Sequence, residues 1–166
     1  SWMRIADNII PSRGKISGGY INSSLAKDQA EAAGFDDALM LNERGKIAEA
    51  SGANLFIVRD GTLITSPITG DILEGITRRS VMMFARDAGI PTEEREIDRS
   101  ELYVADEAFL CGTGAQVAAV GSIDGRDIGT GQRGSITETI QDIFFSCVRG
   151  EDQKYADLLT KVPVRP

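Results

Sequence analysis

Histidine is absent from this 166-residue chain. A serine–histidine–aspartate triad, a cysteine–histidine dyad and a histidine-bound metal are therefore excluded within the chain, and we expect no metal site. Acid–base chemistry near neutral pH is left to lysine, tyrosine, cysteine or a carboxylate with a shifted pKa. The two cysteines, Cys111 and Cys147, are far apart and match neither a metal-ligand spacing nor a disulfide framework, so we expect a reducing, cytoplasmic setting.

Long apolar runs and an excess of basic residues are also missing. The long uncharged stretch at residues 109–123 is interrupted by glycine, threonine, serine and glutamine, so no segment is expected to span a membrane. The chain carries 18 lysine and arginine residues against 25 aspartate and glutamate residues, a net charge of -7. This balance argues against nucleic acid or an anionic membrane as the main partner. With 42% apolar and 26% charged residues, the composition is typical of one globular domain.

The residue pattern predicts helices that alternate with strands. The dipeptides Asp60-Gly61 and Asp124-Gly125 favour tight hairpin turns, whereas other strands are joined by helices. The fold class is therefore α/β, or mixed α+β, with a mixed sheet. Helices are predicted at 22–33, 76–88, 136–148 and 152–161, with a short one from Ser100, and strands at 37–41, 54–59, 62–65, 92–97, 107–111, 117–123 and 126–128. The inward helix faces are predicted to hold Val81, Phe84, Ala85 and Ala88, and Ile136, Ile140, Ile143, Phe144, Cys147 and Val148.

Two segments combine glycine with groups that could bind or attack a ligand. Lys15 precedes two glycines and Tyr20, a setting that suits an amine nucleophile but equally suits a loop lysine in solvent. Gly75, Ile76 and Thr77 open a helix, whose first backbone N–H groups are free to bind phosphate. Simple helix initiation explains the same residues.

Two further segments also allow either a functional or a purely structural explanation. The small residues Thr113, Gly114 and Ala115 follow a strand and leave N–H groups accessible to an oxyanion, or they form an ordinary turn. Glu49 lies among small and apolar residues, where a carboxylate is costly to bury unless a positive group meets it. The alternative is an exposed glutamate at a strand end.

In this order the four segments resemble the class IV (fold type IV) pyridoxal-phosphate aminotransferases, and among them the branched-chain amino acid aminotransferases. The resemblance covers nearly the whole chain and implies a pseudo-barrel of mixed sheet flanked by helices. The residues that carry it are Lys15-Ile16-Ser17-Gly18-Gly19-Tyr20-Ile21-Asn22-Ser23, Glu49-Ala50-Ser51-Gly52-Ala53-Asn54-Leu55-Phe56, Leu73-Glu74-Gly75-Ile76-Thr77-Arg78 and Asp106-Glu107-Ala108-Phe109-Leu110-Cys111-Gly112-Thr113-Gly114-Ala115.

The resemblance implies a role for each candidate residue. Lys15 is implied to form the Schiff base with pyridoxal 5′-phosphate and to carry the proton during transamination. Tyr20 is implied to bind the cofactor phenolate oxygen, and Glu49 the protonated ring nitrogen. The cofactor phosphate falls to the Gly75–Thr77 segment, through Ile76 and Thr77, with Thr113 as a further donor. The amides of Gly114 and Ala115 are implied to receive the substrate carboxylate.

The implied activity is transamination of leucine, isoleucine and valine with 2-oxoglutarate, by a cytoplasmic homodimer or higher homo-oligomer. Family members often have Glu-Gly-Ser-Gly-Glu-Asn and Gly-Thr-Ala-Ala-Glu where this chain has residues 49–54 and 112–116. These departures bear on substrate preference. A D-amino acid aminotransferase, an aminodeoxychorismate lyase and a non-catalytic remnant stay open as alternatives. Family members also carry an additional N-terminal domain, so we expect this chain to be the C-terminal, cofactor-binding part, weakly active by itself.

Overall fold

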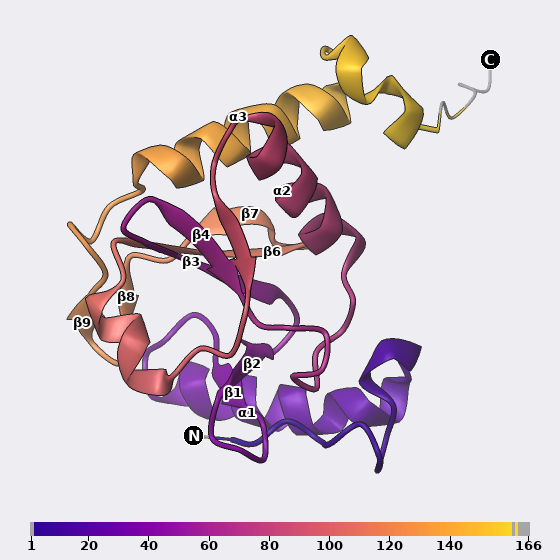
Figure 1. Ribbon diagram of the computed structural model, residues 1–166. Coiled ribbons are helices and arrows are strands. Elements are labelled where there is room, and N and C mark those ends of the chain that lie inside the picture. The colour runs from indigo at the N-terminus through magenta and orange to yellow at the C-terminus, as the bar shows by residue number, and fades with distance from the viewer. Residues whose placement is uncertain (1, 161, 163–166) are drawn as a thin grey trace.

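The computed structural model describes residues 2–160 and residue 162, and a five-stranded mixed sheet lies at its centre (Figure 1). The strand order is β5-β4-β3-β6-β7. Only β4 and β5 run parallel, because the chain crosses over between them through a helix, while the other neighbours are antiparallel. The strands are β3 (Asn54–Arg59), β4 (Thr62–Thr65), β5 (Thr92–Glu94), β6 (Glu107–Gly112) and β7 (Gln116–Ala119).

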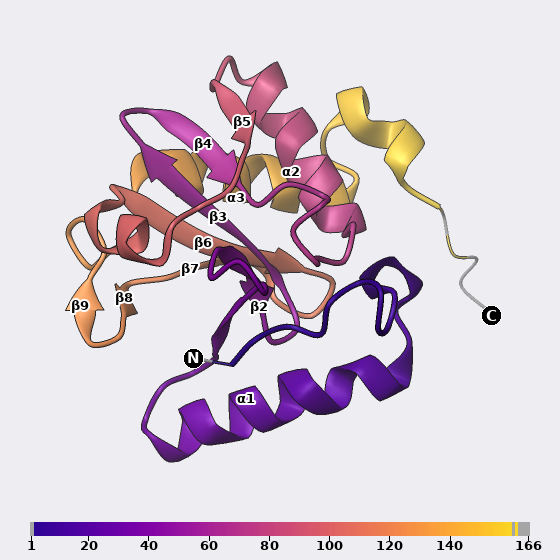
Figure 2. The same cartoon turned by 60° about the horizontal axis from the view of Figure 1, so that its bottom comes forward.

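Two short sheets and several helices complete the described part of the chain. Helices α2 and α3 lie together on one side of the central sheet, and α1 lies on the opposite side of the molecule (Figure 2). The small sheets pair β1 (Leu39–Leu41) with β2 (Ile47–Ala50) and β8 (Ser122–Ile123) with β9 (Arg126–Asp127). The helices are α1 (Tyr20–Ala32), α2 (Ile76–Asp87) and α3 (Ser135–Arg149), with 3₁₀ turns η1 (Ser12–Gly14), η2 (Ser17–Gly19), η3 (Arg99–Val104) and η4 (Gln153–Leu158).

Strand β3 is buried on both faces and separates two apolar clusters. Phe56 and Val58 face the cluster beneath α2 and α3, whereas Leu55 and Ile57 face the cluster beneath β2 and η3. Successive side chains of a strand point to opposite faces, so a central strand covered on both sides must be apolar at every position. This explains the unbroken apolar run in β3.

Helix α1 contributes little to either cluster. Its buried residues are Ser23 and Ala26, and a broad cavity of ≈ 930 Å³ separates it from the edge of the sheet. The cavity is lined by α1 residues such as Ala30 and by Leu110 and Val120 on the sheet side. The position of α1 therefore depends on its first turn and on the segment that precedes it. No helix in the described ranges is long and apolar enough to cross a membrane.

The prediction of a mixed sheet flanked by helices is confirmed. The β3–β4 hairpin has the predicted bounds, and Asp60 and Gly61 both adopt the positive φ that the tight turn requires. Asp124 and Gly125 do the same in the β8–β9 turn. Helices α2 and α3 agree with the predicted ranges to within one residue at each end.

Other predicted boundaries are wrong. Helix α1 begins at Tyr20, two residues before the predicted start at residue 22, because η2 already turns the chain into the helix. The strand predicted at 92–97 ends at Glu94, and the one at 117–123 is divided into β7 and β8. Strand β2, which carries Glu49, is absent from the predicted elements.

The predictions for the helix faces and the last helix also need correction. Ala88 and Val148 are exposed, since each lies at the end of its helix, beyond the packed surface. The segment at 152–161 forms only the 3₁₀ turns of η4, and Lys161 lies outside the described residues.

The stacked pair Phe56–Phe109 provides a test of the core. The ring centroids are 5.1 Å apart with an interplanar angle of 11°, and both side chains are fully buried. Phe109→Ala should lower the free energy of unfolding by about 3–5 kcal/mol, measured by urea denaturation. Val104→Ala, at a side chain 60% exposed, is the control and should change it by less than about 0.5 kcal/mol. Equal losses in the two variants would contradict the assignment of the core.

Candidate active site

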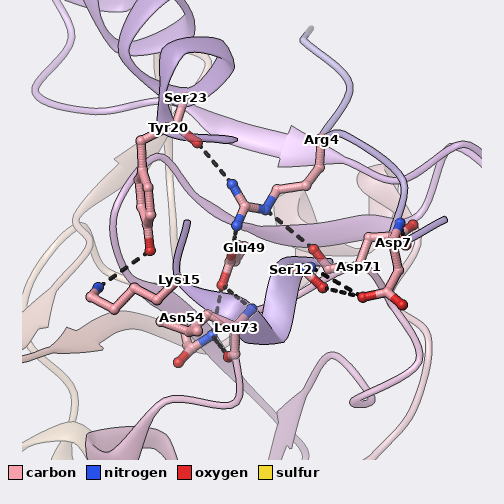
Figure 3. Close-up of polar contacts among 10 residues, drawn as sticks. All are labelled: Arg4, Asp7, Ser12, Lys15, Tyr20, Ser23, Glu49, Asn54, Asp71 and Leu73. Atoms are coloured by element: carbon pink, nitrogen blue, oxygen red, sulfur yellow. Dashed lines mark hydrogen bonds and ion pairs between the residues drawn. The ribbon is translucent and has the colours of Figure 1, made fainter. Parts of the chain in front are cut away.

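The buried carboxylate of Glu49 is the centre of a polar network (Figure 3). Glu49 projects from β2, where only 4% of its surface is exposed. Its Oε1 lies 2.7 Å from a guanidinium nitrogen of Arg4. Its Oε2 accepts hydrogen bonds from Asn54 Nδ2 at 2.8 Å and from the Leu73 N–H at 3.1 Å. The carboxylate therefore has three protein donors, which compensate for the water lost on burial.

The protonation of Glu49 depends on two opposing effects. Burial raises the pKa of Glu49 to about 7, because a charged carboxylate loses solvation inside the protein. The positive charge of Arg4 and the Leu73 N–H act in the opposite direction, followed by the charges of Lys15 and Arg78. Glu49 is thus ionised above about pH 7 and takes up a proton as the pH falls through that value.

Lys15 lies between η1 and η2 in an unusual backbone conformation. Its φ of 47° and ψ of 44° are left-handed, a conformation that costs a non-glycine residue about 1–3 kcal/mol. The preceding residues are held in place, because Ser12 donates from its N–H and its hydroxyl to Asp7, and Arg13 pairs with Glu74. The exposed Lys15 Nζ donates to Tyr20 Oη at 3.2 Å.

Leu73 connects the carboxylate to the start of α2. Its N–H binds Glu49, and its carbonyl accepts from Asn54 Nδ2 at 3.0 Å and from the Gly75 N–H at 2.8 Å. Gly75 is the N-cap of α2 and gives it no side-chain cap. Among the described residues, no side chain accepts from the first N–H groups of α2, at Ile76 and Thr77. The Ile76 side chain beside these donors is 76% exposed.

The turn at Thr113, Gly114 and Ala115 joins β6 to β7 and lies near the same network. Strand β6 pairs with β3 so that Cys111 is opposite Asn54. Gly112 lies against the β2–β3 turn, since a Cβ at Gly112 would be 3.6 Å from the carbonyl oxygen of Gly52. The turn is thereby placed beside the end of β3 that carries Asn54.

The structure brings the sequence-predicted candidates to one region. Lys15 and Tyr20 are in contact, and Glu49 is tied through Leu73 to the helix that begins with Ile76 and Thr77. Cysteine chemistry is disfavoured, because burial raises the pKa of Cys111 to about 12 and also raises that of Cys147.

Sequence reasoning misses the direct partners of Glu49. Arg4 carries no motif of its own, and Asn54 and Leu73 enter only as members of longer motifs. Arg4 is distant in sequence from Glu49, so no local spacing indicates the pair. The one available clue is general: a carboxylate in an apolar segment requires a positive partner, and the chain has few basic residues near its start.

The known proteins that this chain resembles in sequence are aminotransferases. Residues 2–123 match the family model described as amino-transferase class IV. A probable branched-chain-amino-acid aminotransferase of Aquifex aeolicus is 49% identical over 98% of this chain and 52% of its own length. The branched-chain-amino-acid aminotransferase of Pseudomonas aeruginosa is 43% identical over 98% of this chain and 52% of its own length.

Solved structures give the same result. The branched-chain aminotransferase from the thermophilic archaeon Thermoproteus uzoniensis, solved with norvaline, has a TM-score of 0.93 and 47% identity, covering 96% of this chain and 53% of its own. The enzyme from Thermobaculum terrenum in its PLP-form has a TM-score of 0.94 and 46% identity, covering 96% and 52%. The chain spans about half the length of the curated relatives it matches.

The glycine that precedes α2 tests how tightly the network is packed. A Cβ at Gly75 would lie 2.3 Å from Asn54 Oδ1, and Asn54 is held by its bonds to Glu49 and Leu73. Gly75→Ala should therefore lower the free energy of unfolding by about 1–3 kcal/mol. A chain of this size loses roughly 2–4 °C of melting temperature per kcal/mol, which calorimetry measures. Gly52→Ala, where a Cβ meets nothing within 4 Å, is the matched control and should melt within about 2 °C of the parent. A Gly75→Ala variant as stable as that control would contradict the packing described.

Proposed function

Since the chain belongs to the class IV aminotransferase family, we propose that it is the cofactor-binding part of a pyridoxal-phosphate-dependent aminotransferase for branched-chain amino acids. The observation that carries the proposal is the buried Glu49 carboxylate. The charge of Lys15, which contacts Tyr20, acts on this carboxylate, and Leu73 ties the carboxylate to the start of α2, which has no side-chain cap (Figure 3).

The residues present fit the cofactor at its ring nitrogen. A carboxylate offers about four acceptor positions, and Glu49 uses three of them for Arg4, Asn54 and Leu73. One position therefore stays available to a protonated ring nitrogen. A carboxylate that was already saturated would leave no place for this bond.

The residues also fit the cofactor at its phosphate, as a comparison of two helices within the chain indicates. The first N–H groups of α3, at Ile136 and Thr137, donate to the carboxylate of Glu107 at 3.0 and 2.7 Å. Helix α2 has no such cap among the described residues. Its free N–H groups and helix dipole therefore favour an external anion.

The remaining roles follow from position. When bound, pyridoxal phosphate supplies a sink for the electrons released at the substrate α-carbon. In this proposal the exposed Nζ of Lys15 would hold the cofactor covalently and move the proton at that carbon. Tyr20 Oη, which accepts a hydrogen bond from Nζ, would bind the cofactor phenolate oxygen. Thr113 would add a donor to the phosphate. The N–H groups of Gly114 and Ala115 would receive the substrate carboxylate.

The choice of substrate rests on the relatives. They are branched-chain aminotransferases, which supports leucine, isoleucine and valine as amino donors and 2-oxoglutarate as the acceptor. The cytoplasmic location, the homodimeric assembly and the need for a further N-terminal domain belong to the same proposal. The family supports the location and the assembly. The fact that the chain spans about half the length of those relatives supports the further domain.

Covalent trapping tests the assignment of Lys15. Borohydride reduction of the chain mixed with pyridoxal phosphate should attach the cofactor to Lys15, as peptide mass spectrometry would detect. Lys15→Ala should abolish the attachment and the associated visible absorbance. Lys27→Ala is the matched control, because Lys27 is an exposed lysine on α1 that pairs only with Glu31 among the described residues, and it should label normally. Stoichiometric labelling of another lysine in the Lys15→Ala variant would contradict the assignment.

Substrate comparison tests the activity in the whole protein that contains this chain. L-leucine with 2-oxoglutarate should react at least about tenfold faster than D-alanine, a ratio that needs only about 1.4 kcal/mol of transition-state discrimination. Keto-acid formation measures both rates. Preference for D-alanine would indicate a D-amino acid aminotransferase, and pyruvate release from aminodeoxychorismate would indicate a lyase. Cofactor binding with no turnover of any of these would favour a non-catalytic protein.

A further inference from the structure

Arg4 is a buried arginine in the segment that precedes the proposed catalytic lysine. The backbone of this segment lies beside β1, since the Arg4 N–H donates to the Leu41 carbonyl at 2.7 Å and the Leu41 N–H donates to the Trp2 carbonyl at 3.1 Å. This pairing fixes the direction in which the Arg4 side chain leaves the backbone. The side chain is 7% exposed and points at Glu49 (Figure 3).

Each nitrogen of the Arg4 guanidinium has a partner on a different element. One terminal nitrogen lies 2.7 Å from Glu49 Oε1 on β2, and the other donates to Ser23 Oγ on α1 at 2.9 Å. Nε donates to the Asp71 carbonyl at 3.2 Å, in the loop that leads to α2. The Tyr20 ring lies 6.0 Å from the guanidinium carbon. These contacts leave the group little freedom to move away from Glu49.

We infer that Arg4 is a positioning residue, which holds the Glu49 carboxylate charged and turned so that its remaining acceptor position is available to a cationic ligand nitrogen. The inference rests on the proposed role of Glu49. Arg4 itself needs no contact with cofactor or substrate, because its three nitrogens are already occupied by protein acceptors.

Among the charged groups around Glu49, Arg4 contributes most to keeping the carboxylate ionised. Burial raises the pKa of Glu49 to about 7, and Arg4 is the strongest of the groups that oppose the rise. Lys15 and Arg78 contribute less, and each is bound elsewhere, Lys15 to Tyr20 and Arg78 to Ser66 and Glu94. Within the described part of the chain, further groups that act on Glu49 come from β3, the loop before α2 and β6: the uncharged Asn54 amide, the Leu73 N–H and the Cys111 thiol.

Loss of Arg4 should therefore raise the pKa of Glu49. Glu49 would then be an uncharged acid at neutral pH, and a protonated ring nitrogen would have no anionic partner. A lysine cannot replace Arg4 fully, because a single ammonium lacks the planar fork that meets Glu49, Ser23 and Asp71 at once.

The test is a pH titration of the Glu49 carboxyl carbon by ¹³C NMR in the cofactor-free chain. Glu49→Gln assigns the resonance. Arg4→Met should raise the titration midpoint by at least about one pH unit, the equivalent of a tenfold change in the proton equilibrium. Arg4→Lys should raise the midpoint by less. This variant also provides the test if Arg4→Met does not fold. Arg13→Met is the control, since exposed Arg13 pairs with Glu74 and Asp7 instead, and it should leave the midpoint unchanged.

A midpoint that stays unchanged in the folded Arg4 variants would overturn the inference. A second measurement separates this result from a failure of the proposed function. Arg4→Met should weaken pyridoxal phosphate binding at pH 7 by about tenfold and recover affinity near pH 9, where Glu49 ionises again. Glu49→Gln should not recover, because it has no proton to lose.

Each combination of outcomes has one interpretation. A shifted midpoint together with pH-dependent recovery supports both the inference and the proposed function. If the midpoint shifts but the parent chain binds no pyridoxal phosphate, the control of the Glu49 charge by Arg4 stands and the proposed function fails. If the midpoint shifts but the weak binding of Arg4→Met does not recover near pH 9, the charge of Glu49 does not account for the loss of binding, and the positioning role of Arg4 is overturned.

Discussion

The ion pair between Arg4 and Glu49 is the interaction on which the arrangement of the site depends. A buried charge is tolerated only where its partners are close and correctly oriented, and removal of one member of such a pair typically costs about 3–5 kcal/mol. Glu49 draws its donors from the N-terminal segment, from β3 and from the loop before α2, while Arg4 also binds α1. Together with β2, which carries Glu49, five separate parts of the chain must therefore meet within a few ångströms. The apolar core brings the strands together, but this polar network fixes how the outer segments lie against them.

The same network explains how one conformationally strained residue can be maintained. Lys15 has a left-handed backbone between two 3₁₀ turns, and such strain persists only where the surroundings fix the chain on both sides. Before Lys15, Ser12 and Arg13 are bound to Asp7 and Glu74. After it, the chain enters α1, whose first turns carry Tyr20 and Ser23. The lysine side chain is exposed, yet its backbone has few alternatives.

Local patterns in the sequence predict what depends on local physics. Asp60-Gly61 specifies a tight turn by itself, and the apolar periodicities of α2 and α3 reflect faces that pack on the sheet. Strand β5 is shorter than its pattern predicts, because its end depends on where it stops pairing with β4. The resemblance locates the candidate site residues, but nothing in the sequence indicates that Arg4 is the partner of Glu49. That pair is joined by tertiary packing alone, and neither its spacing nor its residue types form a pattern.

Net charge and local charge lead to different expectations for this protein. The chain carries a net charge of -7, which argues against a nucleic-acid surface but says nothing about a single site. The charges of Arg4, Lys15 and Arg78 act on the buried carboxylate of Glu49, whose partner Leu73 lies two residues before Gly75, the N-cap of α2. The start of α2 is positive and has no side-chain cap. An anionic ligand is thus favoured at one place on an otherwise acidic protein. Helix α3 provides the contrast, because the carboxylate of Glu107 binds its first N–H groups and closes that helix start to anions. In α3 the chain's own carboxylate binds the first N–H groups, so that helix end serves stability, whereas the first N–H groups of α2 have no side-chain acceptor among the described residues and are available for binding.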